Sequence, residues 1–186
     1  MILRSEQCPP DIVFRCDYNH QRDVAEKVFT VILEESHRWR TLELRSPSYF
    51  CERLKVVRGR TPCLEFLALH SWNTSQADRA ELAEDIRSLF ADAPCLRNIT
   101  LHGTYGVGDF IFPHHITHLT TSIGDGSNLG IYQSLVECRL QIENGTSGIS
   151  EISPPLHIFL PNVQRLLVPS PKCWRIFAYL LCMTLR

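Results

Sequence analysis

A ten-residue phrase that occurs twice constrains the fold of this chain more than any other feature. Residues 62–71 read Pro-Cys-Leu-Glu-Phe-Leu-Ala-Leu-His-Ser, and residues 94–103 read Pro-Cys-Leu-Arg-Asn-Ile-Thr-Leu-His-Gly. Both follow the pattern Pro-Cys-L-x-x-L-x-L-His, in which L stands for an aliphatic residue. Alternation of apolar and polar residues is typical of a half-buried strand. The sequence therefore predicts two copies of one structural unit, each containing such a strand.

Weaker copies of the phrase give a period. The first apolar positions of six copies are residues 39, 64, 96, 116, 135 and 163. The mean step of about 25 residues is typical of leucine-rich repeats, although the longest and the shortest steps fall outside their range. We therefore predict an α/β fold of the leucine-rich-repeat-like solenoid type. It has a parallel strand ladder on the concave side and helices or irregular segments on the convex side. The alternative is an α/β domain with several leucine-rich strands.

Length and composition favour a single domain. The chain has 186 residues, of which 44% are hydrophobic and 21% charged, so it can bury one continuous core. We expect one leucine-rich-repeat-like domain over residues 1–186. Its well-formed βα units span 8–103, less regular repeats span 104–170, and a terminal helix spans 172–186.

The charge balance gives no reason to expect a polyanionic partner. The formal net charge is −1, and we interpret the four basic residues between positions 53 and 60 as a solvated helix face. The N-terminus has no apolar signal segment, and no apolar run is long enough to span a bilayer. We therefore expect a cytoplasmic or nuclear protein that binds neither nucleic acid nor membrane.

The cysteine pattern favours reduced thiols. None of the eight cysteines belongs to a Cys-x-x-Cys pair, which argues against a zinc ribbon or a thioredoxin-like motif. Cys63 and Cys95 occupy equivalent repeat positions, and Cys138 replaces a core leucine. Because free cysteine packs as a small hydrophobe, we expect packing cysteines without disulfides between them.

The first strand and helix are predicted ahead of the repeated phrases. A strand over residues 11–16 places Ile12 and Phe14 on one face. A helix over residues 23–36 follows, with Asp23 as its N-cap. The aliphatic stripe that we expect this helix to turn to the core consists of Val24, Val28, Val31 and Ile32, widened by Phe29 and Leu33.

Two more helices are predicted between the strands. Ser48 can cap a helix that ends at Gly59, where a left-handed residue belongs. Its apolar side is Phe50, Leu54 and Val57. Helical spacing is clearest over residues 76–91, and Pro94 ends that segment before the next strand.

Motifs for catalysis, cofactors and metals are not found. Residues 103–108 read Gly-Thr-Tyr-Gly-Val-Gly, which does not have the glycine spacing of a dinucleotide loop. His114, His115 and His118 precede and enter a predicted strand, so their side chains do not converge as zinc ligands on a helix do. A G-x-S-x-G nucleophile elbow is missing as well. We expect no catalytic, cofactor or metal site.

The outward side chains of the strand ladder are the candidate ligand surface. Residues between the core aliphatics must face outward because strand side chains alternate. Neighbouring strands would bring His70 and His102 side by side, where close imidazoles disfavour joint protonation and change charge near neutral pH. The candidate partner-binding residues are Glu43, Arg45, Phe66, His70, Asn98, His102, His118, Glu137, Arg139 and Gln141.

Six phrases of the chain share a further likeness; they begin with Cys8-Pro-Pro and continue at 35–45, 57–69, 92–103, 135–140 and 160–166. Together they resemble basidiomycete F-box proteins with divergent leucine-rich repeats. The resemblance implies the substrate-recognition repeats of a ubiquitin-ligase receptor, in which an F-box ahead of the repeats binds the ligase adaptor. An F-box is not visible here, because the first predicted strand begins about a dozen residues from Met1. We therefore do not expect this chain itself to bind the adaptor.

The expected function is that of a non-enzymatic protein-interaction module that binds a protein substrate. The alternatives are a non-catalytic scaffold or truncated fragment without ligase function, and a small α/β enzyme. A convergent polar pocket at the carboxyl ends of the strands favours the enzyme, whereas an open polar sheet favours the binding module.

Overall fold

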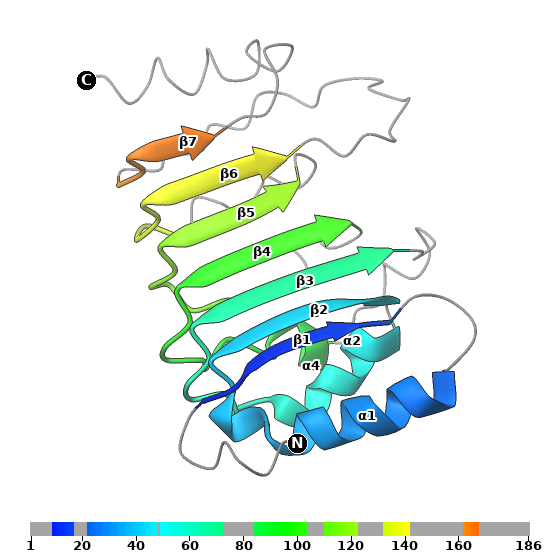
Figure 1. The fold of residues 1–186 in the computed structure, drawn as a ribbon. Coiled ribbons are helices and arrows are strands. Elements are labelled where there is room, and N and C mark those ends of the chain that lie inside the picture. Colours follow the sequence, from blue (N-terminus) through cyan, green and yellow to red (C-terminus); the bar gives the residue numbers. More distant parts are fainter. Residues whose placement is uncertain are drawn as a thin grey trace.

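In the computed structural model, the described residues form a single sheet of seven parallel strands, which lie in the order of the sequence (Figure 1). The structure describes residues 9–16, 22–47, 49–72, 84–103, 110–122, 132–141 and 162–167. Every strand pairs with the strand that follows it in sequence, which confirms an α/β fold with a sequential parallel ladder. The strands are β1 (Asp11–Arg15), β2 (Thr41–Pro47), β3 (Phe66–Trp72), β4 (Asn98–Gly103), β5 (His118–Ser122), β6 (Glu137–Gln141) and β7 (Arg165–Leu167).

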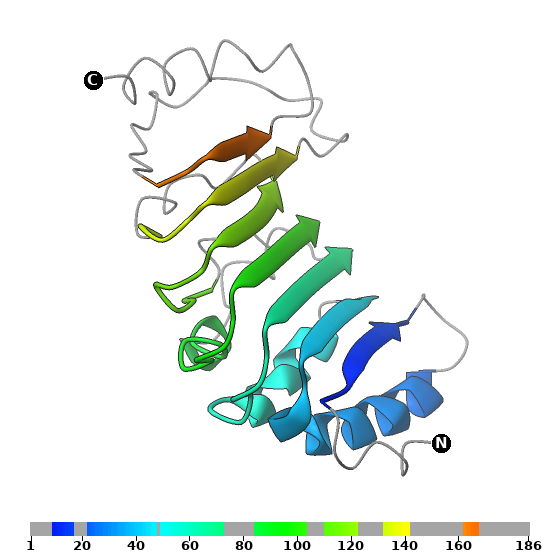
Figure 2. The same cartoon turned by 60° about the vertical axis from the view of Figure 1, so that its left-hand side comes forward.

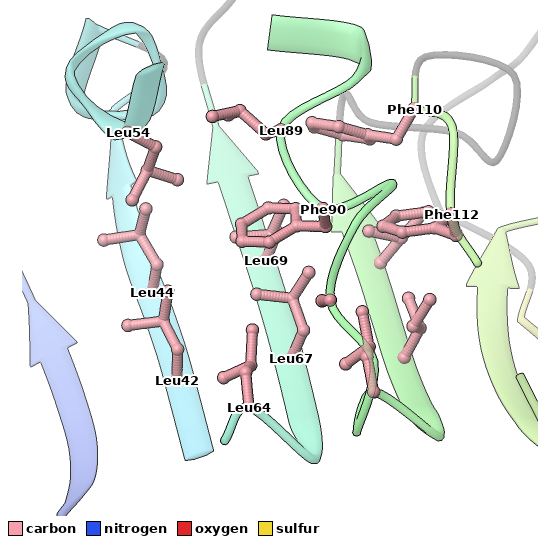
Figure 3. Packing of buried hydrophobic residues seen from close by; sticks show 14 of the residues in the cluster. Leu42, Leu44, Leu54, Leu64, Leu67, Leu69, Leu89, Phe90, Phe110 and Phe112 are labelled. Atoms are coloured by element: carbon pink, nitrogen blue, oxygen red, sulfur yellow. The ribbon is translucent and has the colours of Figure 1, made fainter. Parts of the chain in front are cut away.

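The aliphatic residues of the repeated phrase are aligned across the strands and share one core. Leu67 pairs with Leu42 on one side and with Ile99 on the other, and Leu119 and Cys138 continue this row. The next inward positions are paired in two groups: Leu44, Leu69 and Leu101 on β2–β4, and Thr121 and Leu140 on β5 and β6. Six of the described aliphatic residues at these phrase positions belong to one buried cluster: Leu67, Leu69, Ile99, Leu101, Leu119 and Leu140. Figure 3 shows Leu67 and Leu69 in this cluster. The side chain of Leu166 lies outside the described residues.

The first apolar position of each repeat copy is also buried. Trp39, Leu64 and Leu96 are fully buried, and Ile116 and Leu135 are each 1% exposed. Val163 packs against the same cluster and is partly buried. The indole Nε1 of Trp39 donates a hydrogen bond of 3.2 Å to the carbonyl of Ile32, so this ring joins the first helix to the sheet. The repeat positions taken from the sequence therefore mark real inward-facing sites.

The helices lie on one face of the sheet, and within the described ranges none covers the other face (Figures 1 and 2). Short 3₁₀ turns (η) extend the first two helices. This layer covers the aliphatic rows of the strands. Its elements are α1 (Arg22–Glu34), η2 (Ser36–Arg38), α2 (Tyr49–Arg53), η3 (Leu54–Val57) and α4 (Glu84–Arg87).

The predicted orientation of α1 is wrong. Val24, Val28 and Val31 are 47–55% exposed, whereas Phe29 and Leu33 are buried and Ile32 is partly buried. Aromatic packing sets this orientation, because the ring of Phe29 lies 4.8 Å from that of Phe14 and 5.1 Å from that of Phe50. Asp23 is not the N-cap, since the helix already begins at Arg22, which pairs with Glu26 at 2.8 Å.

The second helical segment agrees with its prediction in its core residues. Phe50, Leu54 and Val57 are fully buried, and Gly59 has the expected left-handed backbone with a φ of 67°. Ser48 lies outside the described residues. One residue of the basic run, Arg53 at the end of α2, does not belong to a solvated face. Its guanidinium donates hydrogen bonds of 2.8 Å to the hydroxyl of Thr30 and 3.4 Å to the carbonyl of Glu26. This arginine ties α2 to α1.

The third predicted helix is shorter at its C-terminal end than expected. The helix α4 ends at Arg87 and turns follow it, although Ile86, Leu89 and Phe90 are all buried. The glycine loop at 104–109 and the terminal segment 172–186 lie outside the described residues, as do positions 73–83. A search of the described helices finds none long and apolar enough to cross a membrane.

The described cysteines form no disulfide with one another, but they do not all pack in the core. Cys51 and Cys138 are buried, whereas Cys63 and Cys95 are exposed. The packing prediction is therefore wrong for the two equivalent cysteines. They lie in the turns that precede β3 and β4, outside the alternation that sends strand residues inward. Cys8, Cys173 and Cys182 are outside the described residues.

Candidate functional site

The candidate site is the sheet surface opposite the helices, which we call the open face. Its side chains alternate with the core leucines, and the pairing register aligns them in transverse rows. The register agrees with the predicted one. The aligned open-face residues are Thr41, Glu43 and Arg45 on β2; Phe66, Ala68 and His70 on β3; Asn98, Thr100 and His102 on β4; His118 and Thr120 on β5; and Glu137 and Arg139 on β6.

Most of these side chains are partly or fully accessible. His118 and Arg139 are exposed, and Ala68 is the exception at 2% exposure. Gln141 pairs with Ser122 in the backbone register, but both side chains lie outside the described residues. Apart from Gln141, the structure thus places every predicted partner-binding residue on one surface.

His70 and His102 form a stack at the carboxyl end of the strands. Their ring centroids are 4.4 Å apart and the ring planes differ by 22°, as expected for paired positions on adjacent strands. Partial burial, the neighbouring His102 and the cation of Arg45 together lower the pKa of His70 to about 4. The prediction that this histidine changes charge near neutral pH is therefore wrong. At neutral pH its ring is a neutral hydrogen-bonding group.

Two arginines continue the histidine row on the neighbouring strands. Arg45 pairs with His70 in the register, and Arg15 pairs with Arg45. Glu43 lies between the two cations, with its carboxylate 3.3 Å from Arg15 and 2.6 Å from Arg45. The row Arg15–Arg45–His70–His102, which we call the basic row, thus has two cations and one adjacent anion.

A second charged cluster lies at the other end of the open face. Glu137 on β6 is 3.8 Å from Arg139 on the same strand and 3.8 Å from Arg165 on β7. Both arginine side chains are more than half exposed. Surface pairs of this kind stabilise a fold little, so these cations remain accessible to an outside partner.

The middle of the open face has no lysine, arginine or acidic residue among its described side chains. The strands β3, β4 and β5 present Phe66, Asn98 and His118 near their first residues. Small side chains then follow in the row of Ala68, Thr100 and Thr120. This arrangement leaves a strip with little side-chain bulk between two arginine-containing clusters.

The sequence prediction missed two residues of the open face, Arg15 and Arg165. Each belongs to an outer strand of the ladder. The alternation of Ile12 and Phe14 already places Asp11, Val13 and Arg15 on the opposite side of β1. The outward position of Arg165 could have been predicted in the same way, because Arg165 directly precedes the inward repeat position of Leu166.

The described residues offer little support for a metal or small-molecule site. No group of three histidine, cysteine or acidic residues among them has the geometry to hold a metal ion. His118 instead makes a 2.9 Å hydrogen bond through Nδ1 to the hydroxyl of Thr117. A cavity of about 240 Å³ lies on the helical side and not on the open face. Its lining is Thr30, Leu33, Glu34, Arg53, Lys55, Val56 and Arg60.

Comparison with protein-family models, with curated proteins and with solved structures gives no match. The class of protein that this geometry defines is therefore limited to an α/β chain with one sequential, all-parallel sheet.

Proposed function

We propose that this chain is a protein-binding module of the leucine-rich-repeat-like solenoid type, and that its open face holds a protein partner. The observation that carries the proposal is the row-by-row alignment of accessible polar side chains on the one sheet face without described helices. The repeat period and the parallel ladder support the solenoid. A binding role fits better than catalysis, because these groups are spread over several strands and do not converge in a pocket.

Charge on the open face favours a partner with acidic side chains. The basic row has Arg15 and Arg45 against the single carboxylate of Glu43, and the β6–β7 cluster has Arg139 and Arg165 against Glu137. Each of these two clusters therefore has one more cation than anion. Arginine can bind a carboxylate through two hydrogen bonds, and the neutral ring of His70 can add another. The strip with little side-chain bulk between the clusters allows the backbone of the partner to approach the sheet.

A pull-down with an altered open face tests this function. The triple variant His70→Ala, His102→Ala and Arg139→Ala removes the histidine stack and one cation of the second cluster. We expect specific partners to be lost from the bound fraction, as identified by mass spectrometry. The matched control replaces Lys27, Glu52 and Asp92 by alanine, because these exposed residues lie outside the open face. Circular dichroism checks that both variants fold.

An unchanged set of partners with the triple variant would show that binding does not use the open face. Loss of the same partners from the control variant would show an unspecific effect of surface substitution. A chain that binds no partner above background in any form would instead be a scaffold or a fragment without a selective ligand.

The finer proposal is that the partners are substrates of a ubiquitin ligase, as the resemblance to F-box repeat proteins implies. A proteasome inhibitor provides the test. Substrates should accumulate and be enriched in the bound fraction when degradation is blocked, and this enrichment should need the intact open face. Partners that bind equally with and without the inhibitor contradict the ligase role but leave the binding role in place.

A further inference from the structure

The end of the ladder formed by β1 and α1 presents a backbone edge and an apolar helix stripe together. Among the described strands, β1 pairs with β2 only. Val24, Val28 and Val31 recur at helical spacing on α1, and each is about half exposed. We call the edge of β1 and these three valines the end face.

The edge of β1 that no described strand covers has backbone groups available for pairing. Backbone N–H and C=O groups point alternately to the two sides of a strand. The N–H of Cys16 donates 2.9 Å to the carbonyl of Arg45, so Ile12 and Phe14 direct their backbone groups to β2 as well. By the same alternation Asp11, Val13 and Arg15 direct theirs away from the sheet. Such an edge favours pairing with another strand.

The valine stripe lies on the same side of the ladder as this edge. Thr30 of α1 contacts Arg53 of α2, which marks the side of α1 that faces the next unit. Val28 is two residues from Thr30 and therefore about 200° away around the helix. It faces away from the rest of the ladder, and Val24 and Val31 lie one turn on either side of it. Figure 1 shows β1 and α1 together at this end of the molecule.

The sequence of β1 is complementary to itself when two copies run antiparallel. Pairing centred on Val13 places Asp11 opposite Arg15 of the second copy and Ile12 opposite Phe14. The N–H and C=O groups at positions 11, 13 and 15 are then opposed, which is the pattern of an antiparallel ladder. Asp11 and Arg15 already pair with Arg40 and Glu43 but are 50% and 60% exposed, so both can accept a second partner.

We propose that a second copy of this chain binds to the end face, with the two β1 strands antiparallel across a two-fold axis and the valine stripes packed together. The two sheets then become one, and the open face continues across both copies. The charged pairs set the register, because complementary charges contribute more to specificity than to affinity. The apolar stripe supplies the buried surface. At the other end of the described sheet, β7 covers only three described residues and offers less to pair with.

Position 28 tests the two-fold axis, because both copies of Val28 lie near it. Sedimentation velocity of the full chain over a range of concentrations should show a concentration-dependent dimer. Val28→Lys and Val28→Glu should each raise the dimer dissociation constant about tenfold or more, since like charges then face each other. Mixing the two variants should restore a dimer of one copy each. Val56→Lys, at an equally exposed valine on η3, is the matched control and should dimerise as the wild type does.

A second variant, Val13→Pro, removes an edge N–H without removing a bond to β2, and it should also weaken the dimer. Circular dichroism verifies the fold of each variant, and the position-28 pair decides the question if Val13→Pro unfolds. A wild-type chain that remains monomeric up to millimolar concentration would overturn the proposal. So would a dimer that survives both substitutions at position 28, or a mixture of the two that stays monomeric.

Discussion

The part of the ladder from β1 to β4 and the part from β5 to β7 have the same strand pairing. They differ in the layer of chain that covers the apolar face of the sheet. The connections from Leu42 to Leu67 and from there to Ile99 are long enough to leave room for helical segments behind the sheet. The next two connections, from Ile99 to Leu119 and from there to Cys138, are shorter. No helix lies in the described residues of this second part, and irregular segments with bulky side chains cover it instead.

The difference shows what the ladder requires from each unit. Phe110 and Phe112 are buried in the same core cluster as Leu89 and Phe90, although no described helix carries these two rings (Figure 3). Tyr132 is buried in this cluster as well. The N–H of Ile111 donates a hydrogen bond of 2.6 Å to the carbonyl of Arg87, the last residue of α4. This bond ties the segment to the end of that helix. A unit therefore needs the aliphatic strand and apolar volume behind it, whereas the secondary structure of that second layer can vary.

The largest expected effect is in the aromatic cluster of the first part. Phe29→Ala should lower the free energy of unfolding by about 3–5 kcal/mol, because three closely packed rings lose their common contact. Phe112→Ala should cost less, since an irregular segment can collapse into the space more easily than a helix. Urea denaturation of both variants gives the comparison. Equal losses in the free energy of unfolding would mean that the layer behind the sheet is packed equally well in the two parts.

A smaller contrast is expected between equivalent strand positions. Leu69 is fully buried between Leu44 and Leu101, whereas Leu140 is 8% exposed and pairs with Thr121, whose buried hydroxyl has no hydrogen-bond partner. Leu69→Ala should fall in the upper half of the usual range of about 2–5 kcal/mol, and Leu140→Ala in the lower half. The same denaturation measurement applies. A greater loss at Leu140 would contradict the looser packing of the second part.

The smallest effect is a pH dependence confined to the first part. Burial, His102 and Arg45 lower the pKa of folded His70 to about 4 from 6.5, so the unfolded chain binds the proton more readily in this interval. Stability from the neutral ring is present above pH 6.5 and is lost as the pH falls towards 4. As the pH falls from 6.5 towards 4, the melting temperature of the wild type should therefore approach that of His70→Asn or fall below it.

The partner of the stack provides the control for this titration. His102→Asn removes one cause of the lowered pKa, while burial and Arg45 remain, so the pH dependence should weaken but persist. Arg15 lowers this pKa as well, and Glu43 raises it. A difference between wild type and His70→Asn that does not vary between pH 6.5 and 4 would contradict the assigned shift.

The strands and their register were predictable because both depend on local alternation. Leu67, Leu69 and His70 sit on their faces by position within one short phrase, and equivalent phrases align when the strands stack. The stack of His70 on His102 follows from the same rule. The prediction failed where a property depends on contacts between distant residues: partial burial and nearby cations, and not the neighbouring ring alone, set the pKa of His70.

The orientation of α1 and the exposure of the turn cysteines could not be obtained from spacing. Aliphatic residues occupy a wide arc of α1, and packing of Phe29 against Phe14 and Phe50 decides which part of that arc is buried. Equivalent repeat positions identify Cys63 and Cys95 as a pair but do not show whether a turn residue reaches the core. Periodicity thus specifies where a residue lies along a unit, whereas burial depends on what the neighbouring unit supplies.

The strictly sequential order of the sheet has a consequence for how the chain folds. Paired positions on adjacent strands are never farther apart along the chain than Leu67 and Ile99 are. The entropy cost of closing each loop is therefore modest, and a paired β2–β3 nucleus can grow by one strand at a time in either direction. Because the strand that each new strand joins has already been synthesised, folding of this ladder can keep pace with synthesis on the ribosome.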